Sequence, residues 1–465
     1  MKVMALKYLI LIACLTFFVP LKAGASDNGF SLKEALQLAL ENNATLAAAR
    51  QNYYGVAENL AQAVSGFRPD VSINGDITNI QSQPEGNSFI TQEGGNLSRG
   101  ASIDVVQPVF RGGSTSAEVR AARNAITAQH WLLKETYQDV LGNVARAYWD
   151  MSLQADTLAL NVSNRELLQK QLEENQARFE AGELTRTDVS QAKSRLAAAT
   201  ASVASSQSAL NNAKAKLAEL IRVPVETVDF ETFDKLEGFP ETVTQALELA
   251  DKQNPSSVAA RFLHNASVDG VNNVIGELLP QINLVAQAQE TKDPYPGFLD
   301  SERTETIQLN ATIPLYQSGA TRSRARQAKY AVAENKATLI ETEEEVRTKA
   351  IQSWEAYKSA EFEIEAFEEQ IEAATVALEG AGEEVRYGLR AAIDELDAQQ
   401  ELLDARVSLV RSRFNRANAA VDVMQVTGQF LPAQLGLDMS TLPQNQEVMD
   451  KIGGNWFGLD VDYTK

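Results

Sequence analysis

Cysteine and histidine are almost missing from this sequence, which narrows the chemistry that the chain can perform. The single cysteine, Cys14, lies in an N-terminal apolar run, so a chain cleaved behind that run has neither a disulfide nor a thiolate. The two histidines, His130 and His264, form no nucleophile–base pair and no metal-ligand spacing. Because a phosphate-binding glycine loop is missing as well, the sequence indicates no enzyme, no metal site and no other cofactor.

Proline and aromatic residues are also scarce. Proline is absent between Pro108 and Pro224 and again between Pro314 and Pro432, and aromatic residues make up 7% of the chain. Since proline breaks the interior of a helix, these stretches, rich in Ala, Gln and Glu, predict long exposed helices rather than a bulky globular core. The formal net charge of −20 would repel nucleic acid, which excludes it as a partner.

The first 25 residues have the pattern of a secretory signal. Lysines precede the apolar stretch 8–19, and small residues end at Ala25, the predicted cleavage site. The stretch is too short for a transmembrane helix. We therefore expect an exported protein. The alternative, lipidation at Cys14, stays open, although apolar sequence continues to Pro20 and disfavours it.

An internal repeat is the strongest signal in the chain. Eight residues between Leu36 and Pro69 recur 211 positions later, and Pro108–Gly113 is matched 206 positions later by Pro314–Gly319. Because the offset falls by five, the second copy has a shorter loop, as a duplication with one trimmed loop produces. The sequence predicts two repeats, 26–221 and 242–431, a linker at 222–241, and a tail at 432–465 to which we assign no structure.

Each repeat switches from a helical to an alternating pattern after a proline. We expect strands at about 69–80 and 99–110, and at about 280–291 and 303–315. Alternating apolar and polar residues are typical of transmembrane β-barrel strands, although a soluble sheet with one wet face has the same pattern. Four strands cannot close a barrel, and lipid leaves an open edge unpaired. If these strands cross a membrane, several chains must share one barrel.

A long helical hairpin follows each strand pair. The proline-free runs continue for roughly 65 to 70 residues, or on the order of 100 Å, before they stop at Gly182 and Gly388. In the returning run, apolar and small residues from Val189 to Leu220 are spaced alternately three and four apart, which is a coiled-coil seam. We predict a mainly α-helical chain with a duplicated unit of helix, strand pair and long helical hairpin.

The order of these segments resembles the TolC-like outer-membrane efflux family. The most specific stretches are Pro314–Gly319 and Gly388–Gln399, and the resemblance extends from about Ser31 to Leu431. It implies a homotrimer in which four strands per chain form one twelve-stranded β-barrel in outer-membrane lipid. The helices would form an α-helical tunnel that projects into the periplasm.

The same resemblance implies a passive exit duct for drugs or secreted proteins. A periplasmic adaptor (membrane fusion) protein would open the duct, and an inner-membrane RND or ABC transporter would supply the energy. The sequence does not separate the two kinds of cargo. The alternative is a non-transporting trimeric coiled-coil envelope or adhesive protein, which leaves the amphipathic strand pairs without a purpose.

The family's closed gate maps onto the hairpin tips. By resemblance, Thr187 and Asp188 face a basic partner at Arg390, while Asp394 and Asp397 are the constricting carboxylates on one helix face. Three copies of both carboxylates around one opening are expected to favour cations and to hold a divalent ion.

Among the other tip residues, one departs from the family pattern, and several can be explained by the turns alone. The family's gate tyrosine falls on Val385, so the tyrosine link is missing here, and Tyr387 points elsewhere on the helix. We expect the adaptor to contact the tips, although the turns alone would call for several of the same residues. The adaptor-contact candidates are Gly182, Leu184, Thr185, Gly388 and Leu389.

Overall fold

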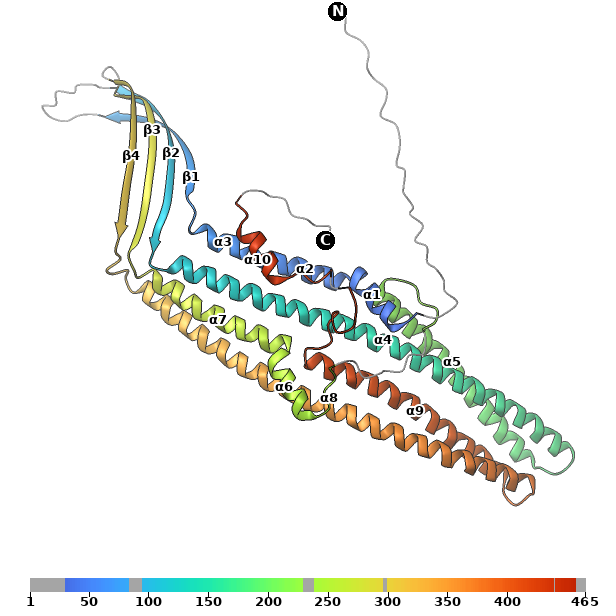
Figure 1. The fold of residues 1–465 in the computed structure, drawn as a ribbon. Helices are drawn as coiled ribbons and strands as arrows, with labels where there is room; N and C mark the ends of the chain where they lie inside the picture. The colour runs from blue at the N-terminus through green and yellow to red at the C-terminus, as the bar shows by residue number, and fades with distance from the viewer. Residues whose placement is uncertain (1–29, 83–93, 229–237, 296–298, 439, 457–465) are drawn as a thin grey trace, which may run out of the picture.

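The computed structural model describes residues 30–82, 94–228, 238–295, 299–438 and 440–456, and it is strongly elongated (Figure 1). The predicted signal segment therefore lies outside the described residues. A four-stranded sheet forms one end, and the tips of two helical hairpins lie side by side at the other. The predicted mainly helical, duplicated architecture is confirmed.

The sheet is antiparallel, and its order, β1-β2-β3-β4, follows the chain. The two repeats meet where β2 pairs with β3, with Ile103 opposite Ala288. The register between β2 and β3 shifts between Pro108 and Phe110, because proline has no N–H to donate to the ladder. Compared with the predicted ranges, β2 begins earlier and β4 ends earlier. The strands are β1 Asp70–Ser82, β2 Gly94–Arg111, β3 Gln281–Tyr295 and β4 Leu299–Thr312.

The two faces of the sheet differ in polarity, because side chains alternate along each strand. The register places Val71, Val105, Ala286 and Ile307 in one cross-strand row. The next row on the opposite face consists of Ser72, Asp104, Gln287 and Thr306. Asp104 accepts hydrogen bonds from Asn74 and Ser102, both at 2.7 Å. The apolar face is uncovered in the single chain: the side chains of Ile73 and Ile307 are both 78% exposed.

Two long helices, α4 and α8, carry the fold from the sheet to the tips. Each has 67 residues, on the order of 100 Å at 1.5 Å per residue, as the proline-free runs predicted. Across the described part of the chain, no helix combines the length and apolarity needed to cross a membrane. The helices are α1 Leu32–Asn42, α2 Ala44–Ala57, α3 Asn59–Ser65, α4 Ser114–Glu180, α5 Arg186–Ile221, α6 Val243–Gln253, α7 Pro255–Gly276, α8 Ala320–Arg386, α9 Ala392–Val426 and α10 Asn445–Gly453.

Small residues line the seams on which α5 and α9 return along α4 and α8. On α5, Ala192, Ala199, Ser206 and Ala213 are buried at intervals of seven residues. On α9, the buried residues include Leu402, Ala405 and Ser412. The predicted coiled-coil seam is thereby confirmed. Short side chains let neighbouring helices approach closely, which leaves the hairpins slender.

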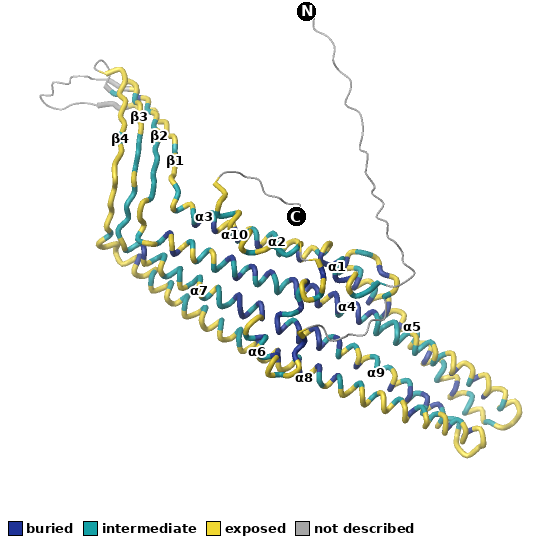
Figure 2. Tube along the Cα trace, viewed as in Figure 1, coloured by how far each residue is buried: buried dark blue, intermediate teal, exposed yellow. Residues whose placement is uncertain are grey.

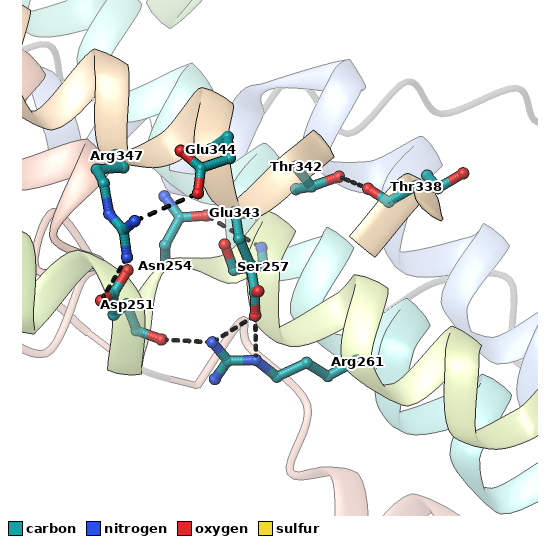
Figure 3. A network of polar contacts seen from close by, with 9 residues as sticks. All are labelled: Asp251, Asn254, Ser257, Arg261, Thr338, Thr342, Glu343, Glu344 and Arg347. Atoms are coloured by element: carbon teal, nitrogen blue, oxygen red, sulfur yellow. Dashed lines mark hydrogen bonds and ion pairs between the residues drawn. The ribbon is translucent and has the colours of Figure 1, made fainter. Parts of the chain in front are cut away.

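In each repeat, an asparagine joins the start of one helix to the end of the returning helix of the hairpin. Asn43 caps α2 and donates its amide to the carbonyl of Leu220, at 3.2 Å. Its counterpart Asn254 caps α7 by accepting a hydrogen bond from the Ser257 amide at 3.2 Å (Figure 3). Asn254 also donates its own amide to the carbonyl of Val426, at 2.9 Å. Each asparagine satisfies a helix N-terminus and a carbonyl at the end of the returning helix together, which explains its recurrence 211 residues apart.

The main core lies at mid-height, where the first helices and the tail cover α4 (Figure 2). Tyr53 and Tyr137 are fully buried, and their hydroxyls donate to Asn445 at 2.9 Å and to the carbonyl of Thr441 at 2.5 Å. His130 packs against the Tyr53 ring with a centroid separation of 5.7 Å, and burial lowers the pKa of His130 to about 4. The tail, which the sequence left unassigned, therefore closes over this core.

Candidate functional site: the hairpin tips

Both hairpins turn through the same backbone motif. Gly182 and Gly388 adopt φ values of 84° and 72°, the left-handed conformation that favours glycine. The amide of Glu183 bonds to the Arg178 carbonyl at 2.9 Å, and the amide of Leu389 bonds to the Glu384 carbonyl at 2.8 Å. These are six-to-one bonds that close a helix end. The two tips are therefore structural copies, as the aligned glycines predicted.

The first tip uses its acidic residue as a helix cap. The Asp188 carboxylate accepts the Thr185 amide at 2.8 Å and the Thr185 hydroxyl at 2.7 Å, while the Thr185 hydroxyl accepts the Asp188 amide. These hydrogen bonds from Thr185 lower the pKa of Asp188. Asp188 is thus an ionised capping-box residue that holds the start of α5. Its neighbour Thr187 is exposed.

The second tip has lost that cap. Ala391 stands 206 residues after Thr185 and offers no side-chain hydrogen bond to the start of α9. The equivalent carboxylate, Asp394, is exposed, and no side chain in the described ranges forms an ion pair or hydrogen bond with it. Thr185 thus engages Asp188 in a helix cap at the first tip. Because alanine replaces this threonine at the second tip, the Asp394 carboxylate stays available there for other contacts.

Arg390 forms its ion pair within the second tip. Its Nε lies 2.8 Å from a Glu384 carboxylate oxygen. Across the described residues of the single chain, Arg390 forms no ion pair with Asp188, and the predicted link of Arg390 to Asp188 or Thr187 across helices stays a prediction. Val385, which occupies the family's tyrosine position, is buried, whereas Tyr387 is exposed.

The two hairpins contact each other just behind the tips. Arg195 of α5 lies 2.6 Å from the Asp397 carboxylate of α9, and Gln399 donates to Asn164 at 3.1 Å. Leu396 is buried against Leu168 of α4 and Ala199 of α5. We call this set of contacts the hairpin clasp. Asp397, predicted as a pore carboxylate, is part of the clasp in the single chain.

Arg195 was missed by sequence reasoning, although a signal for it exists. It lies seven residues after Asp188, so the two residues share one face of α5 two turns apart. Its acidic partner lies 202 residues further along the chain. Only the rotation of α9 about its own axis decides that Asp397, rather than Asp394, turns toward Arg195.

Around the clasp, the space between the hairpins is lined by polar as well as apolar side chains. Burial, and then repulsion from Glu174, raise the pKa of Glu395. A cavity of about 370 Å³ lies between α4, α5 and α9, lined by Asn161, Ser202 and Asp404 among others. A seam with a polar cavity loses less on separation than a dry apolar core would. The geometry suits two hairpins that can move relative to each other.

The predicted adaptor-contact residues lie on the outermost surface of the tips. Gly182, Thr185 and Gly388 are exposed, and Leu184 is partly buried. The Leu389 side chain is 75% exposed. An apolar side chain at a tip that none of the described residues covers is typical of a docking position, but the adaptor contact itself remains a prediction.

The sequence is similar to known envelope proteins over almost its full length. A family model described as outer membrane efflux protein matches residues 35–221 and 246–429. Outer membrane efflux protein BepC of Brucella suis biovar 1 (strain 1330) is 27% identical over 430 residues, 92% of each chain. Outer membrane protein TolC of Escherichia coli (strain K12) is 23% identical, over 92% of this chain and 91% of TolC. Alkaline protease secretion protein AprF of Pseudomonas aeruginosa is 22% identical, over 69% and 67%.

Solved structures share the fold at lower identity. A structure of CusC superimposes with a TM-score of 0.77 at 14% identity and covers 85% of this chain and 92% of that one. The open state of the MtrE outer membrane channel of Neisseria gonorrhoeae superimposes with a TM-score of 0.73 at 18% identity, covering 86% and 89%.

Proposed function

The chain belongs to the outer membrane efflux protein family, and from this premise we propose that three copies form a passive exit duct whose periplasmic tips open and close. The alternative of a non-transporting coiled-coil protein is weakened by the sheet, which such a protein does not need. An enzyme is not indicated, because the family is one of transport channels.

The observation that carries the proposal is the open, two-faced sheet. β1 and β4 are edge strands, since the sheet order ends with them, and their side chains are almost all exposed. In hydrocarbon, unpaired backbone groups at such an edge cost several kcal/mol each. Pairing β4 of one chain with β1 of the next removes both edges and turns every apolar face outward.

Strand number sets a lower limit on the number of chains. A barrel of about eight strands has an interior that side chains fill, so two chains would leave no duct. Three chains give twelve strands, the arrangement that the family resemblance implies. The inward face would then carry Asp104, Gln287 and Thr306, which suit a water-filled lumen.

The helices also present a surface that calls for neighbouring chains. Along α8, Tyr330, Ile340, Ile351 and Phe362 are exposed at spacings of about eleven residues, which is three helical turns. Large apolar side chains in such a stripe are out of place on a helix facing water. Packing of α8 against the next chain would cover them and extend the barrel into a helical tunnel.

The tips supply the gate in this proposal. Asp394 is exposed and without a partner in the described part of its own chain, so three copies would form an acidic ring that favours cations. Arg390 would bridge to Asp188 or Thr187 of a neighbouring chain, and the hairpin clasp would hold the two hairpins of one chain together. Each such exposed ion pair contributes about 1 kcal/mol or less. A docked adaptor could therefore overcome them.

Partners and cargo follow from the relatives' names only as proposals. We infer docking of a periplasmic adaptor at the tips and energy from an inner-membrane RND or ABC transporter. The names of the relatives include both efflux and protease secretion, so drugs and secreted proteins are both candidate cargo. Deletion of the gene, followed by drug-sensitivity tests and by profiling of secreted protein, separates the two.

The direct test is reconstitution of the purified protein. Light scattering of detergent-extracted protein should give a mass of three chains, and insertion into planar bilayers should give ion conductance. A monomer that stays soluble without detergent, or a trimer that never conducts, would refute the duct and favour the non-transporting alternative.

A further inference from the structure

An arginine just before the first strand holds the end of the described tail. The Arg68 guanidinium donates to the carbonyl of Asn455 at 2.9 Å and to the carbonyl of Gly453 at 3.0 Å. Its Cζ also lies 4.5 Å from the centre of the Trp456 ring, a cation–π distance. Three contacts from one side chain fix the segment after α10 and determine where Trp456 lies.

That place is the base of the sheet. Arg68 precedes Asp70, the first residue of β1, by two residues, so the reach of its side chain keeps the Trp456 ring within about 20 Å of the strand's start. The neighbouring apolar side chains of Phe67 and Val71 are 52% and 62% exposed. In the proposed barrel, Val71 belongs to the face turned toward lipid. Trp456, itself 58% exposed, extends that apolar surface onto the tail.

The core does not explain why the tail ends in this way. Val448, Met449 and Ile452 of α10 are partly buried against the core, but Trp456 lies three residues beyond the helix and is not part of that core. An indole ring exposed beside the end of a lipid-facing strand matches the known preference of tryptophan for the membrane–water interface, where the ring is apolar and its N–H stays wet. The Arg68 guanidinium is already engaged, so its part is to position the ring.

We propose that Trp456 is an interfacial anchor that binds the tail to the phospholipid surface of the membrane in which the barrel lies, and that Arg68 positions it. The proposal rests on the proposed function, because the β1 strand must cross that membrane. It assigns the C-terminal segment a task at the membrane rather than at the gate.

Fluorescence provides a selective test, because the other tryptophans lie far from the sheet. Trp131 is 17 residues along α4 from Ser114, or about 25 Å, and Trp149 and Trp354 are each about 50 Å along their helices. Reconstituted trimers are measured in vesicles with and without lipid brominated near the headgroup end of its acyl chains. The emission of Trp456 is taken as the difference between wild type and Trp456→Phe.

We expect brominated lipid to remove most of this difference emission and aqueous acrylamide to remove a smaller part of it, because only the N–H edge of an interfacial indole stays in contact with water. Trp131→Phe, the matched control, should leave the lipid quenching unchanged. Arg68→Gln keeps Trp456 but releases it, so lipid quenching should fall while channel conductance persists.

Three other results overturn the proposal. Quenching by acrylamide but not by lipid places Trp456 in water, and quenching by neither places it under a neighbouring chain. Unchanged lipid quenching in Arg68→Gln removes the positioning role. Conductance separates these failures from a failure of the duct: if wild-type trimers conduct, the duct stands while the anchor falls, and if no trimers insert, both fall.

Discussion

Breaking the ion pair between Arg195 and Asp397 should loosen the two hairpins of each chain near the tips. Arg195→Gln removes the positive charge but keeps a side chain of similar length. The Asp397 carboxylate then loses its partner at 2.6 Å, while Leu396 and Gln399 keep the rest of the hairpin clasp. We expect a channel that opens more readily, with three additional carboxylates free to face the passage.

The magnitude follows from exposure. The side chains of Arg195 and Asp397 are 40% and 59% exposed, so solvent screens the pair and limits its contribution to about 0.2–1 kcal/mol per chain. At the upper limit, loss of the ion pair lowers the equilibrium constant for the closed state roughly fivefold per chain. Three independent chains would lose up to about 3 kcal/mol together. This effect should fade near 1 M salt, where the Debye length is about 3 Å.

Single-channel recording in planar bilayers at low and high salt measures this effect. Lys193→Gln is the matched control: it makes the same charge change on an exposed residue of the same helix, and no described residue forms an ion pair with Lys193. The double variant Arg195→Gln/Asp397→Asn completes a cycle that isolates the pair. If Arg195→Gln and Lys193→Gln shift conductance equally, or if the cycle is additive, the ion pair does not hold the tips closed.

Three further predictions concern the gate, pH and processing. Arg390→Ser should raise single-channel conductance, and Asp394→Ala with Asp397→Ala should weaken cation selectivity and divalent block. If all of these variants keep wild-type values, the three charged residues have no role in the gate and simply lie on a solvated helix surface. Burial lowers the pKa of His130 from 6.5 to about 4, so its contribution to folding stability is complete above pH 6.5 and falls by at most about 3 kcal/mol as the pH drops toward 4. The thermal unfolding of His130→Gln should therefore depend less on pH between 6.5 and 4 than the unfolding of the wild type. N-terminal sequencing and intact mass should show cleavage near Ala25, and an acylated Cys14 would contradict this.

Local periodicity and the repeat made most of the architecture predictable. The proline-free runs predicted α4 and α8, and the aligned glycines predicted both tips, because helix length and a left-handed turn are properties of short stretches of chain. The capping box from Thr185 to Asp188 is a property of four consecutive residues and can likewise be read from the sequence.

Contacts between distant segments were less predictable. The ion pair of Arg195 with Asp397 depends on helix rotation to within a fraction of a turn, which a pattern of apolar residues does not fix. The tail gave no clear signal, because α10 has only nine residues, none of them fully buried, and it is held by contacts with distant segments such as the hydrogen bond of Tyr53 with Asn445. Such contacts come from side chains hundreds of positions away.

The central claim is that β1 and β4 of neighbouring chains close one barrel, and cysteine cross-linking tests it most directly. The predicted cleavage after Ala25 would remove the only native cysteine, and Cys14→Ser removes it in any case, so Ile73→Cys in β1 can be combined with substitutions along β4, such as Ile307→Cys or Leu309→Cys, without background. A thiol-reactive linker applied to membranes should produce cross-linked dimers and trimers and nothing larger, because a ring of three chains has three seams. Monomers alone at every pairing along β4, or a ladder that continues beyond three chains, would contradict the shared barrel.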